Sequence, residues 1–130
     1  MLILLVDDDA EDRELFAEAV RVIDPSINCT LIHTCEDSLK ALDELEELPS
    51  YIFLDINMPG MNGIKCLEEI RKRSAFKDIQ VIMYSTSRNP KEISSSTTLG
   101  ANGFLTKPSN FSELVSSLRS LLGFRNTSVK

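Results

Sequence analysis

The sequence predicts an α/β protein in which a five-stranded parallel sheet carries helices on both faces, the doubly wound arrangement. Short apolar segments alternate with longer amphipathic ones, and the links between them are short. This alternation is typical of a sheet built from successive strand–helix units. The apolar segments are also nearly continuous in aliphatic residues, as parallel strands buried on both faces are.

The strands are assigned from runs of apolar and β-branched residues bounded by polar residues, glycine or proline. The first is the clearest, because Leu2–Val6 is apolar throughout. The expected strands span residues 2–6, 27–33, 51–54, 79–84 and 103–106.

The helices are assigned from apolar residues at helical spacing. Asp9, Glu11 and Asp12 surround the first turn of the first helix, where the helix dipole favours negative charge, so we expect helix-start charges there rather than ligands. The fourth helix is rich in serine and threonine, which are poor helix formers, and we hypothesise that it is the least stable and the easiest to remodel. The expected helices span 10–23, 36–48, 64–73 and 91–99, and the last runs from a cap at Ser109 or Asn110 to about Leu122.

Length and composition restrict the class of protein. A chain of 130 residues is one domain, expected over 1–123 with a tail at 124–130 and no output domain. The net charge of -6 argues against binding nucleic acid. The longest apolar run, Met1–Val6, is too short to span a bilayer and lacks the flanks of a signal peptide. We therefore expect a cytoplasmic protein without a membrane partner.

The cysteines and the histidine predict no metal or redox centre. Cys29, Cys35 and Cys66 form no C-x-x-C pair and are odd in number, so we expect three free thiols that act as small apolar residues. His33 has no second histidine to help it bind zinc.

Polar side chains of complementary kinds follow four of the expected strands. Asp7 and Asp8 follow the first strand, Asp55 the third, Ser85 the fourth and Lys107 the fifth. The carboxyl ends of parallel strands lie at one edge of the sheet, where doubly wound proteins bind ligands. We therefore expect these side chains to meet.

Three carboxylates at one edge require a cation, because together they repel one another. Mg²⁺ fits, since it takes carboxylates, waters and phosphate oxygens. We expect Asp8 and Asp55 as direct ligands, Asp7 acting mainly through water, and a further oxygen from the backbone carbonyl of Asn57. Calcium is the second choice, but the stretch after Val6 lacks the glycine and distal glutamate of a calcium loop.

The same group of side chains can accept a phosphoryl group. A carboxylate can attack phosphorus and become an acyl phosphate, and the protein then mainly positions groups and neutralises charge. Asp55 is the expected nucleophile. Mg²⁺, Lys107 and the Ser85 hydroxyl would each cover one phosphoryl oxygen.

Four segments together resemble the receiver domain of two-component response regulators. The resemblance extends from Leu2 to about Leu122 and implies the flavodoxin-like (βα)5 form of the doubly wound fold. The matching segments are LLVDDDAEDREL at 4–15, FLDINMPGMNG at 53–63, VIMYSTS at 81–87 and LGANGFLTKP at 99–108.

Carried over by position, the resemblance implies an acidic metal pair at Asp7 and Asp8 and a phosphoacceptor at Asp55. It also implies that Lys107 contacts the phosphoryl group. Members of the family typically hold the following bond, here Lys107–Pro108, in the cis form, which proline makes accessible.

The resemblance also implies a switch. Ser85 would be the hydroxyl that moves toward the phosphoryl group, and Phe104 the aromatic residue that follows it. The surface of the fourth helix, fifth strand and fifth helix would then change shape. The chain departs from the family where Phe104 replaces a frequent tyrosine, Thr86 a typical alanine and Thr97 a frequent aromatic residue.

The function implied is that of a stand-alone, chemotaxis-type receiver that is a phosphoacceptor rather than an enzyme. Its donor would be a phosphohistidine on a histidine kinase or histidine phosphotransfer protein, and it would promote its own phosphorylation and dephosphorylation. Its signal would pass to a downstream protein that the sequence does not identify. A phosphorylation-dependent homodimer stays open.

Two other functions compete with this one. An aspartate-nucleophile phosphatase of the haloacid dehalogenase type would use Asp7 and Asp9 as a D-x-D pair, but Glu11 stands where that family has Thr or Val. A receiver-like docking module without phosphorylation usually lacks one of the acids or the lysine, and this chain has them all.

Overall fold

The expected strands form one parallel sheet. In the computed structural model, which describes residues 1–124, the strands are β1 (Leu2–Val6), β2 (Asn28–Ile32), β3 (Tyr51–Leu54), β4 (Gln80–Ser85) and β5 (Gly103–Thr106). Most of the expected tail, residues 125–130, lies outside the described part. The strand order is β2-β1-β3-β4-β5 and every pairing is parallel.

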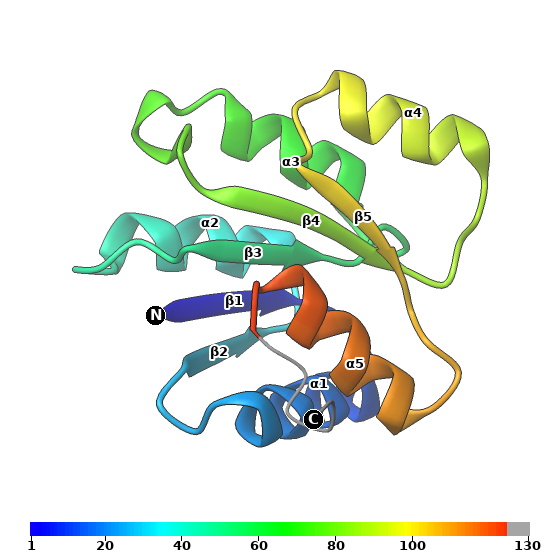
Figure 1. The fold of residues 1–130 in the computed structure, drawn as a ribbon. Helices are drawn as coiled ribbons and strands as arrows, with labels where there is room; N and C mark the ends of the chain where they lie inside the picture. Colours follow the sequence, from blue (N-terminus) through cyan, green and yellow to red (C-terminus); the bar gives the residue numbers. More distant parts are fainter. Residues whose placement is uncertain (125–130) are drawn as a thin grey trace.

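Helices cover both faces of this sheet. Figure 1 shows α1 and α5 side by side on one face, and α2, α3 and α4 on the other. Within residues 1–124, no helix is both long and apolar enough to cross a membrane. The helices are α1 (Ala10–Ile23), α2 (Cys35–Glu44), α3 (Gly63–Arg71), α4 (Pro90–Thr98) and α5 (Phe111–Leu121), with a short 3-10 helix at Ser74–Phe76.

Alternating side chains of the central strands supply two separate cores. Leu4, Leu54 and Met83 pack under α2 and α3, whereas Leu5 and Phe53 pack under α1 and α5. Phe53 also meets the rings of other aromatic residues edge-on in this second core. Burial on both faces explains why these strands read as continuous apolar runs. The predicted doubly wound, flavodoxin-like fold is confirmed by the strand order and the helix layers.

The boundaries of two helices differ from the expectation. The helix expected at 36–48 ends at Glu44, because Leu45 has an extended backbone and only its N–H still bonds to the helix, at the Ala41 carbonyl. The helix expected at 64–73 ends at Arg71, and the 3-10 turn at Ser74–Phe76 follows it. Helix periodicity alone does not locate such ends, which depend on how the chain turns toward the next strand.

The prediction of three free thiols is wrong, because Cys35 and Cys66 form a disulfide and only Cys29 is free. The lack of a C-x-x-C motif excludes only a local pair. The packing of α2 against α3 brings together two residues that are 31 positions apart in the sequence.

The expected cis bond before Pro108 is also absent, since no peptide bond in the described part of the chain is cis. The trans form is the intrinsically preferred one for an X–Pro bond, by about 0.5–1 kcal/mol.

The serine-rich helix α4 buries little. Ser96 is its only buried residue, and the hydroxyls of Ser96 and Thr97 donate hydrogen bonds back to the carbonyls of Glu92 and Ile93. Such back-bonding slightly destabilises a helix. These contacts are consistent with the hypothesis that α4 is the weakest helix, which hydrogen exchange would test.

Gly63, the first residue of α3, packs against the backbone of Asp55. A Cβ atom at this position would lie 2.1 Å from the Asp55 carbonyl oxygen. We therefore expect Gly63→Ala to lower the free energy of unfolding by about 3 kcal/mol, through overpacking against main chain that cannot move aside. Urea unfolding measures it.

Gly123→Ala is the matched control. Gly123 has a φ of +81°, but no heavy atom of residues 1–124 lies within 4 Å of an added Cβ. Its substitution should cost about 1 kcal/mol, from backbone strain alone. Equal losses for the two variants would contradict close packing of α3 on Asp55.

Candidate functional site

The sheet brings the predicted polar residues to one edge. Main-chain hydrogen bonds continue the strand pairing just past the strand ends, from Asp7 N to Ile32 O and from Asp55 N to Val6 O, each 2.9 Å. At the other side of the sheet, Lys107 N bonds to Ser85 O at 2.8 Å. These bonds fix the backbone from which the polar side chains extend.

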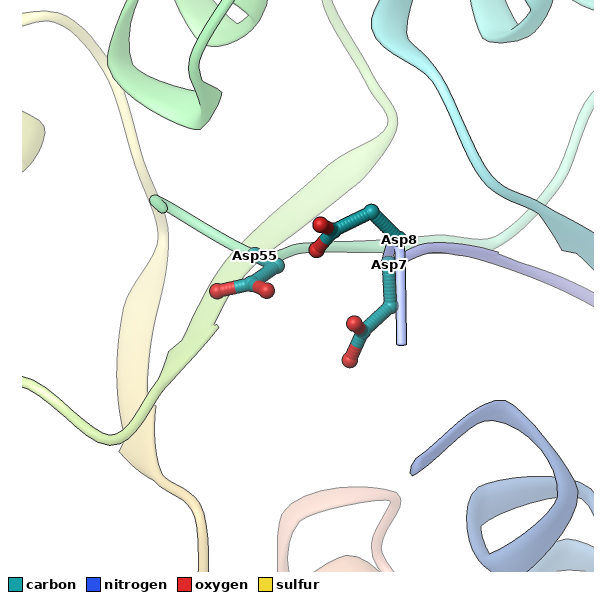
Figure 2. A group of neighbouring side chains, drawn as sticks. All are labelled: Asp7, Asp8 and Asp55. Atoms are coloured by element: carbon teal, nitrogen blue, oxygen red, sulfur yellow. The ribbon is translucent and has the colours of Figure 1, made fainter. Parts of the chain in front are cut away.

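Three carboxylates converge at this edge. Oxygen atoms of Asp7, Asp8 and Asp55 all lie within 4.8 Å of one another. Figure 2 shows the carboxylate of Asp8 directed toward that of Asp55, with Asp7 beside them. Asp7 and Asp55 are buried, at 0% and 5% exposure, whereas Asp8 is exposed. The cluster therefore opens to solvent on the side of Asp8.

Lys107 reaches the same cluster from the end of β5. Its amine lies 2.9 Å from Asp7 Oδ2 and 3.5 Å from Asp55 Oδ2, and its side chain is only 11% exposed. Its shortest contact is with Asp12, at 2.7 Å. The lysine charge is thus shared among three carboxylates.

The donor set fits a divalent cation. Lys107 carries one positive charge, which does not balance the three carboxylates of Asp7, Asp8 and Asp55. Asp7 Oδ2 is buried and has no hydrogen-bond partner among the described residues, so its contact with the lysine amine is one of charge without hydrogen-bond alignment. Oxygen ligands with excess negative charge, two of them buried, are what Mg²⁺ or Mn²⁺ prefers.

The electrostatics of the site make ionisation of Asp55 less favourable than in an exposed carboxyl group. Burial raises the pKa of Asp55 to about 6, and the charge of Lys107 only partly opposes it while Asp7 adds to it. Burial by itself would lower the pKa of Lys107, but the hydrogen bond to Asp12 and the contacts with Asp7 and Asp55 raise it overall. Lys107 therefore stays charged.

The remaining predicted residues lie around this cluster. Ser85 is fully buried, and its hydroxyl oxygen accepts a hydrogen bond from Ser87 N at 3.2 Å. Phe104 is half-buried on the neighbouring strand, where it pairs with Met83 on the face that also carries Ser85. Asn57 is exposed on the loop after Asp55, and its N–H bonds to Asp55 Oδ1 at 3.3 Å.

Asp12 is a member of the site that sequence reasoning missed. Its position in the first turn of α1 predicts only a helix-start charge, yet its carboxylate holds the lysine amine. No local signal could have shown this, because the two residues are 95 positions apart. Asp9 and Glu11, by contrast, are exposed, and Asp9 caps α1 by accepting a hydrogen bond from Asp12 N.

Comparison with known proteins identifies the class of protein. The family model described as the response regulator receiver domain matches residues 3–119. The chain therefore belongs to this family, and the resemblance seen in its sequence is confirmed. Proteins of this class are phosphoacceptors that bind a divalent metal at an acidic pocket and have phosphodonor partners such as kinases.

Curated relatives match this chain over different shares of their own length. The chain is 33% identical over 120 residues to the transcriptional regulatory protein CpxR homolog of Haemophilus influenzae, across 92% of this chain and 49% of that protein. It is 30% identical over 131 residues to the response regulator Rcp1 of Synechocystis sp., across 95% of this chain and 87% of that protein. The chain thus spans about half the length of the first relative and most of the second.

Solved structures of response regulators have the same fold as this chain. The Mn²⁺-bound form of response regulator Rcp1 superposes with a TM-score of 0.83 at 26% identity, covering 95% of this chain and 92% of that one. The phosphorylated cyanobacterial phytochrome response regulator RcpA gives 0.85 at 28% identity, covering 92% and 89%. The family match favours a receiver over the phosphatase alternative, for which Asp9 would have to leave its capping role.

The raised pKa of Asp55 predicts that its charge destabilises the metal-free protein. Between about pH 4 and pH 6 the folded state binds more protons at Asp55 than the unfolded state, so stability falls as pH rises through this window. Asp55→Asn should therefore raise the free energy of unfolding by about 2 kcal/mol at pH 7.5 in EDTA. The gain should vanish at pH 4.

Thermal unfolding of both proteins at the two pH values checks this prediction. Glu47→Gln, which removes the same charge from an exposed loop residue, is the control and should change stability by less than about 0.5 kcal/mol. A destabilised Asp55→Asn variant at pH 7.5 would show that the buried negative charge of Asp55 does not lower the free energy of unfolding.

Proposed function

We propose that this chain is a single-domain response regulator that accepts a phosphoryl group on Asp55 in a Mg²⁺-dependent reaction. The donor is a phosphohistidine of a sensor kinase or histidine phosphotransfer protein. One observation carries the proposal: the buried carboxylate of Asp55 lies within 4.8 Å of Asp7 and Asp8 and 3.5 Å from the amine of Lys107. A nucleophile, a metal-binding pair and a fixed cation are thus adjacent.

The transfer needs little from the protein beyond position and charge. One oxygen of Asp55 forms a bond to phosphorus while the bond from phosphorus to the donor imidazole nitrogen breaks, and the electron pair of that bond stays on the imidazole. Lys107 neutralises one phosphoryl oxygen, and the Ser85 hydroxyl donates to another. When bound, Mg²⁺ neutralises carboxylate and phosphoryl charge; Asp8, Asp55, the Asn57 carbonyl and, through water, Asp7 would hold it.

The protein supplies these groups to its own modification and is not an enzyme with a separate substrate. The same groups favour later attack of water on the acyl phosphate, which resets the receiver. In the phosphorylated state Ser85 moves toward the phosphoryl group and Phe104 rotates into the space that it leaves. Their placement on one face of adjacent strands supports this coupling.

The signal then leaves through a protein partner. The family match to residues 3–119 supports a receiver spanning 1–123. The surface of α4, β5 and α5 is where the switch would be read, by a downstream protein or a second copy of the chain. The weak packing of α4 supports its remodelling.

Labelling with acetyl phosphate tests the proposal. In 10 mM Mg²⁺ we expect one phosphoryl group per chain, seen by intact mass, and none in EDTA. Asp55→Asn should take up no label, because an amide cannot form the acyl phosphate. Phosphopeptide mapping after borohydride trapping should locate the group at Asp55.

The matched control is Asp78→Asn, which changes an exposed acid away from the cluster. It should be labelled like the wild type. Equal label in wild type and Asp55→Asn, or none in either, would contradict the assignment of the acceptor.

Asp12 should restrain Lys107 in the unphosphorylated protein. Asp12→Asn removes the shortest contact of the lysine amine, 2.7 Å, and one negative charge near the incoming phosphoryl group. Both effects favour transfer, so the rate of labelling by acetyl phosphate should rise roughly three- to tenfold.

Glu11→Gln, which neutralises the exposed acid next to Asp12, should leave the rate within about twofold, because it does not touch the lysine. Asp12→Glu should restore a rate near that of the wild type. A slower Asp12→Asn variant would show instead that Asp12 orients Lys107 productively.

A further inference from the structure

A covalent bond links two helices on the face of the sheet behind the acceptor. Cys35 is the first residue of α2 and Cys66 lies within α3, and their Cα atoms are 5.7 Å apart. This separation is the usual one for a disulfide. Both side chains are 0% exposed, so the bond belongs to the core between these helices.

The disulfide adjoins the loop that carries Asp55 into α3. Met61, in that loop, places its sulfur 3.3 Å from the sulfur of Cys35. At the end of the loop Gly63 packs on the Asp55 carbonyl, and Cys66 is one helical turn further. The bond therefore fixes both the helix on which the loop ends and the helix against which Met61 rests.

We propose that Cys35 and Cys66 form a reversible thiol–disulfide pair, a redox input to this receiver, and that the oxidised state slows phosphoryl transfer to Asp55. The loop between Asp55 and Gly63 also carries Asn57, whose carbonyl the proposed function assigns to the metal ion. A cross-link between α2 and α3 restricts the movement of this loop. The effect on transfer rests on the function proposed above, whereas the redox chemistry does not.

The two cysteines have different roles in the oxidation. Cys35 lies at the N-terminus of α2, where the helix dipole favours the thiolate more than within α3, so it is the attacking sulfur. Because its side chain is 0% exposed, the peroxide reaches it when the packing of α2 against α3 opens locally. Its thiolate attacks a peroxide, the O–O bond breaks, and the cysteine becomes a sulfenic acid. The Cys66 sulfur then displaces water from that sulfenic acid. Two electrons and two protons pass from the thiols to the peroxide, which leaves as water when it is hydrogen peroxide.

Cys29 provides an internal comparison. It lies on β2, apart from the pair, and burial raises the pKa of its thiol to about 11. It is the one free cysteine among the described residues, so it has no neighbouring thiol with which to form an internal disulfide. It should remain reduced under conditions that oxidise Cys35 and Cys66.

Mass spectrometry of the full chain tests the redox pair. The protein is equilibrated in buffers that span reduced to oxidised glutathione, or exposed to hydrogen peroxide, and then denatured and alkylated. We expect three alkyl groups after dithiothreitol and one after oxidation, with a cross-linked peptide that joins Cys35 to Cys66. Oxidation should raise the melting temperature by roughly 5–15 °C, because the bond constrains the unfolded chain.

Two outcomes would overturn the redox pair. Three alkyl groups at every glutathione ratio and after peroxide would show that the bond does not form. A bond that dithiothreitol cannot reduce in the folded protein would show a permanent cross-link. Cys29→Ser should keep the transition and Cys66→Ala should lose it; Cys35→Ala is the second variant if Cys66→Ala fails to fold.

Acetyl phosphate labelling of the two redox forms tests the effect on transfer. We expect the oxidised protein to be labelled at least threefold more slowly than the reduced protein, and Cys66→Ala to show the reduced rate under both conditions. Equal labelling rates for the two forms would contradict the effect of oxidation on transfer, but they would not contradict the acceptor role of Asp55. Absence of label in the reduced protein would instead count against the proposed function itself.

Discussion

Lys107 and the buried acids around it form the interaction on which the rest of the site depends. A single amine lies 2.7 to 3.5 Å from the carboxylates of Asp12, Asp7 and Asp55. Each partner comes from a different strand end or from the first turn of α1. Removing water from charged groups is expensive unless opposite charges meet. The sheet fixes the strand ends so that these opposite charges meet, which offsets the cost of their desolvation when no metal is bound.

The acidic cluster carries negative charge that its protein partners do not balance. One lysine does not neutralise the acids, one buried oxygen of Asp7 has no hydrogen bond from the described part of the chain, and the pKa of Asp55 is raised to about 6. Each of these features weakens the folded state, and a divalent cation bound at the cluster would relieve it. Perturbed groups of this kind cluster where chemistry takes place. In the proposed function, the same excess of negative charge links metal binding, stability and phosphoryl transfer.

The scaffold behind Asp55 is unusually constrained for a loop-borne site. Gly63 leaves no room for a side chain beside the Asp55 carbonyl, and the disulfide of Cys35 and Cys66 joins the two helices that flank the loop. On the same face of the sheet, α4 buries only Ser96. The molecule thus combines a firmly held acceptor with a loosely held helix. Such a division suits a protein in which a local chemical event changes a distant surface.

Much of the fold followed from the sequence by itself, because local rules determine it. The apolar run of Leu2–Val6, the residues before Asp55 and the segment before Lys107 are each typical of a buried strand, and their bounds agree with the structure. The order of the strands and the edge at which Asp7, Asp8, Asp55 and Lys107 meet follow from the parallel, doubly wound class.

Tertiary packing decided what the sequence could not. The contact of Asp12 with Lys107 and the bond between Cys35 and Cys66 join residues 95 and 31 positions apart. Neither pair has a local sequence signature, since the residues around a helix-start acid or a buried cysteine do not indicate its distant partner. The end of α2 at Glu44 likewise depends on how the chain returns to the sheet. Periodicity and propensity describe neighbours along the chain, whereas charge pairing and cross-linking depend on neighbours in space.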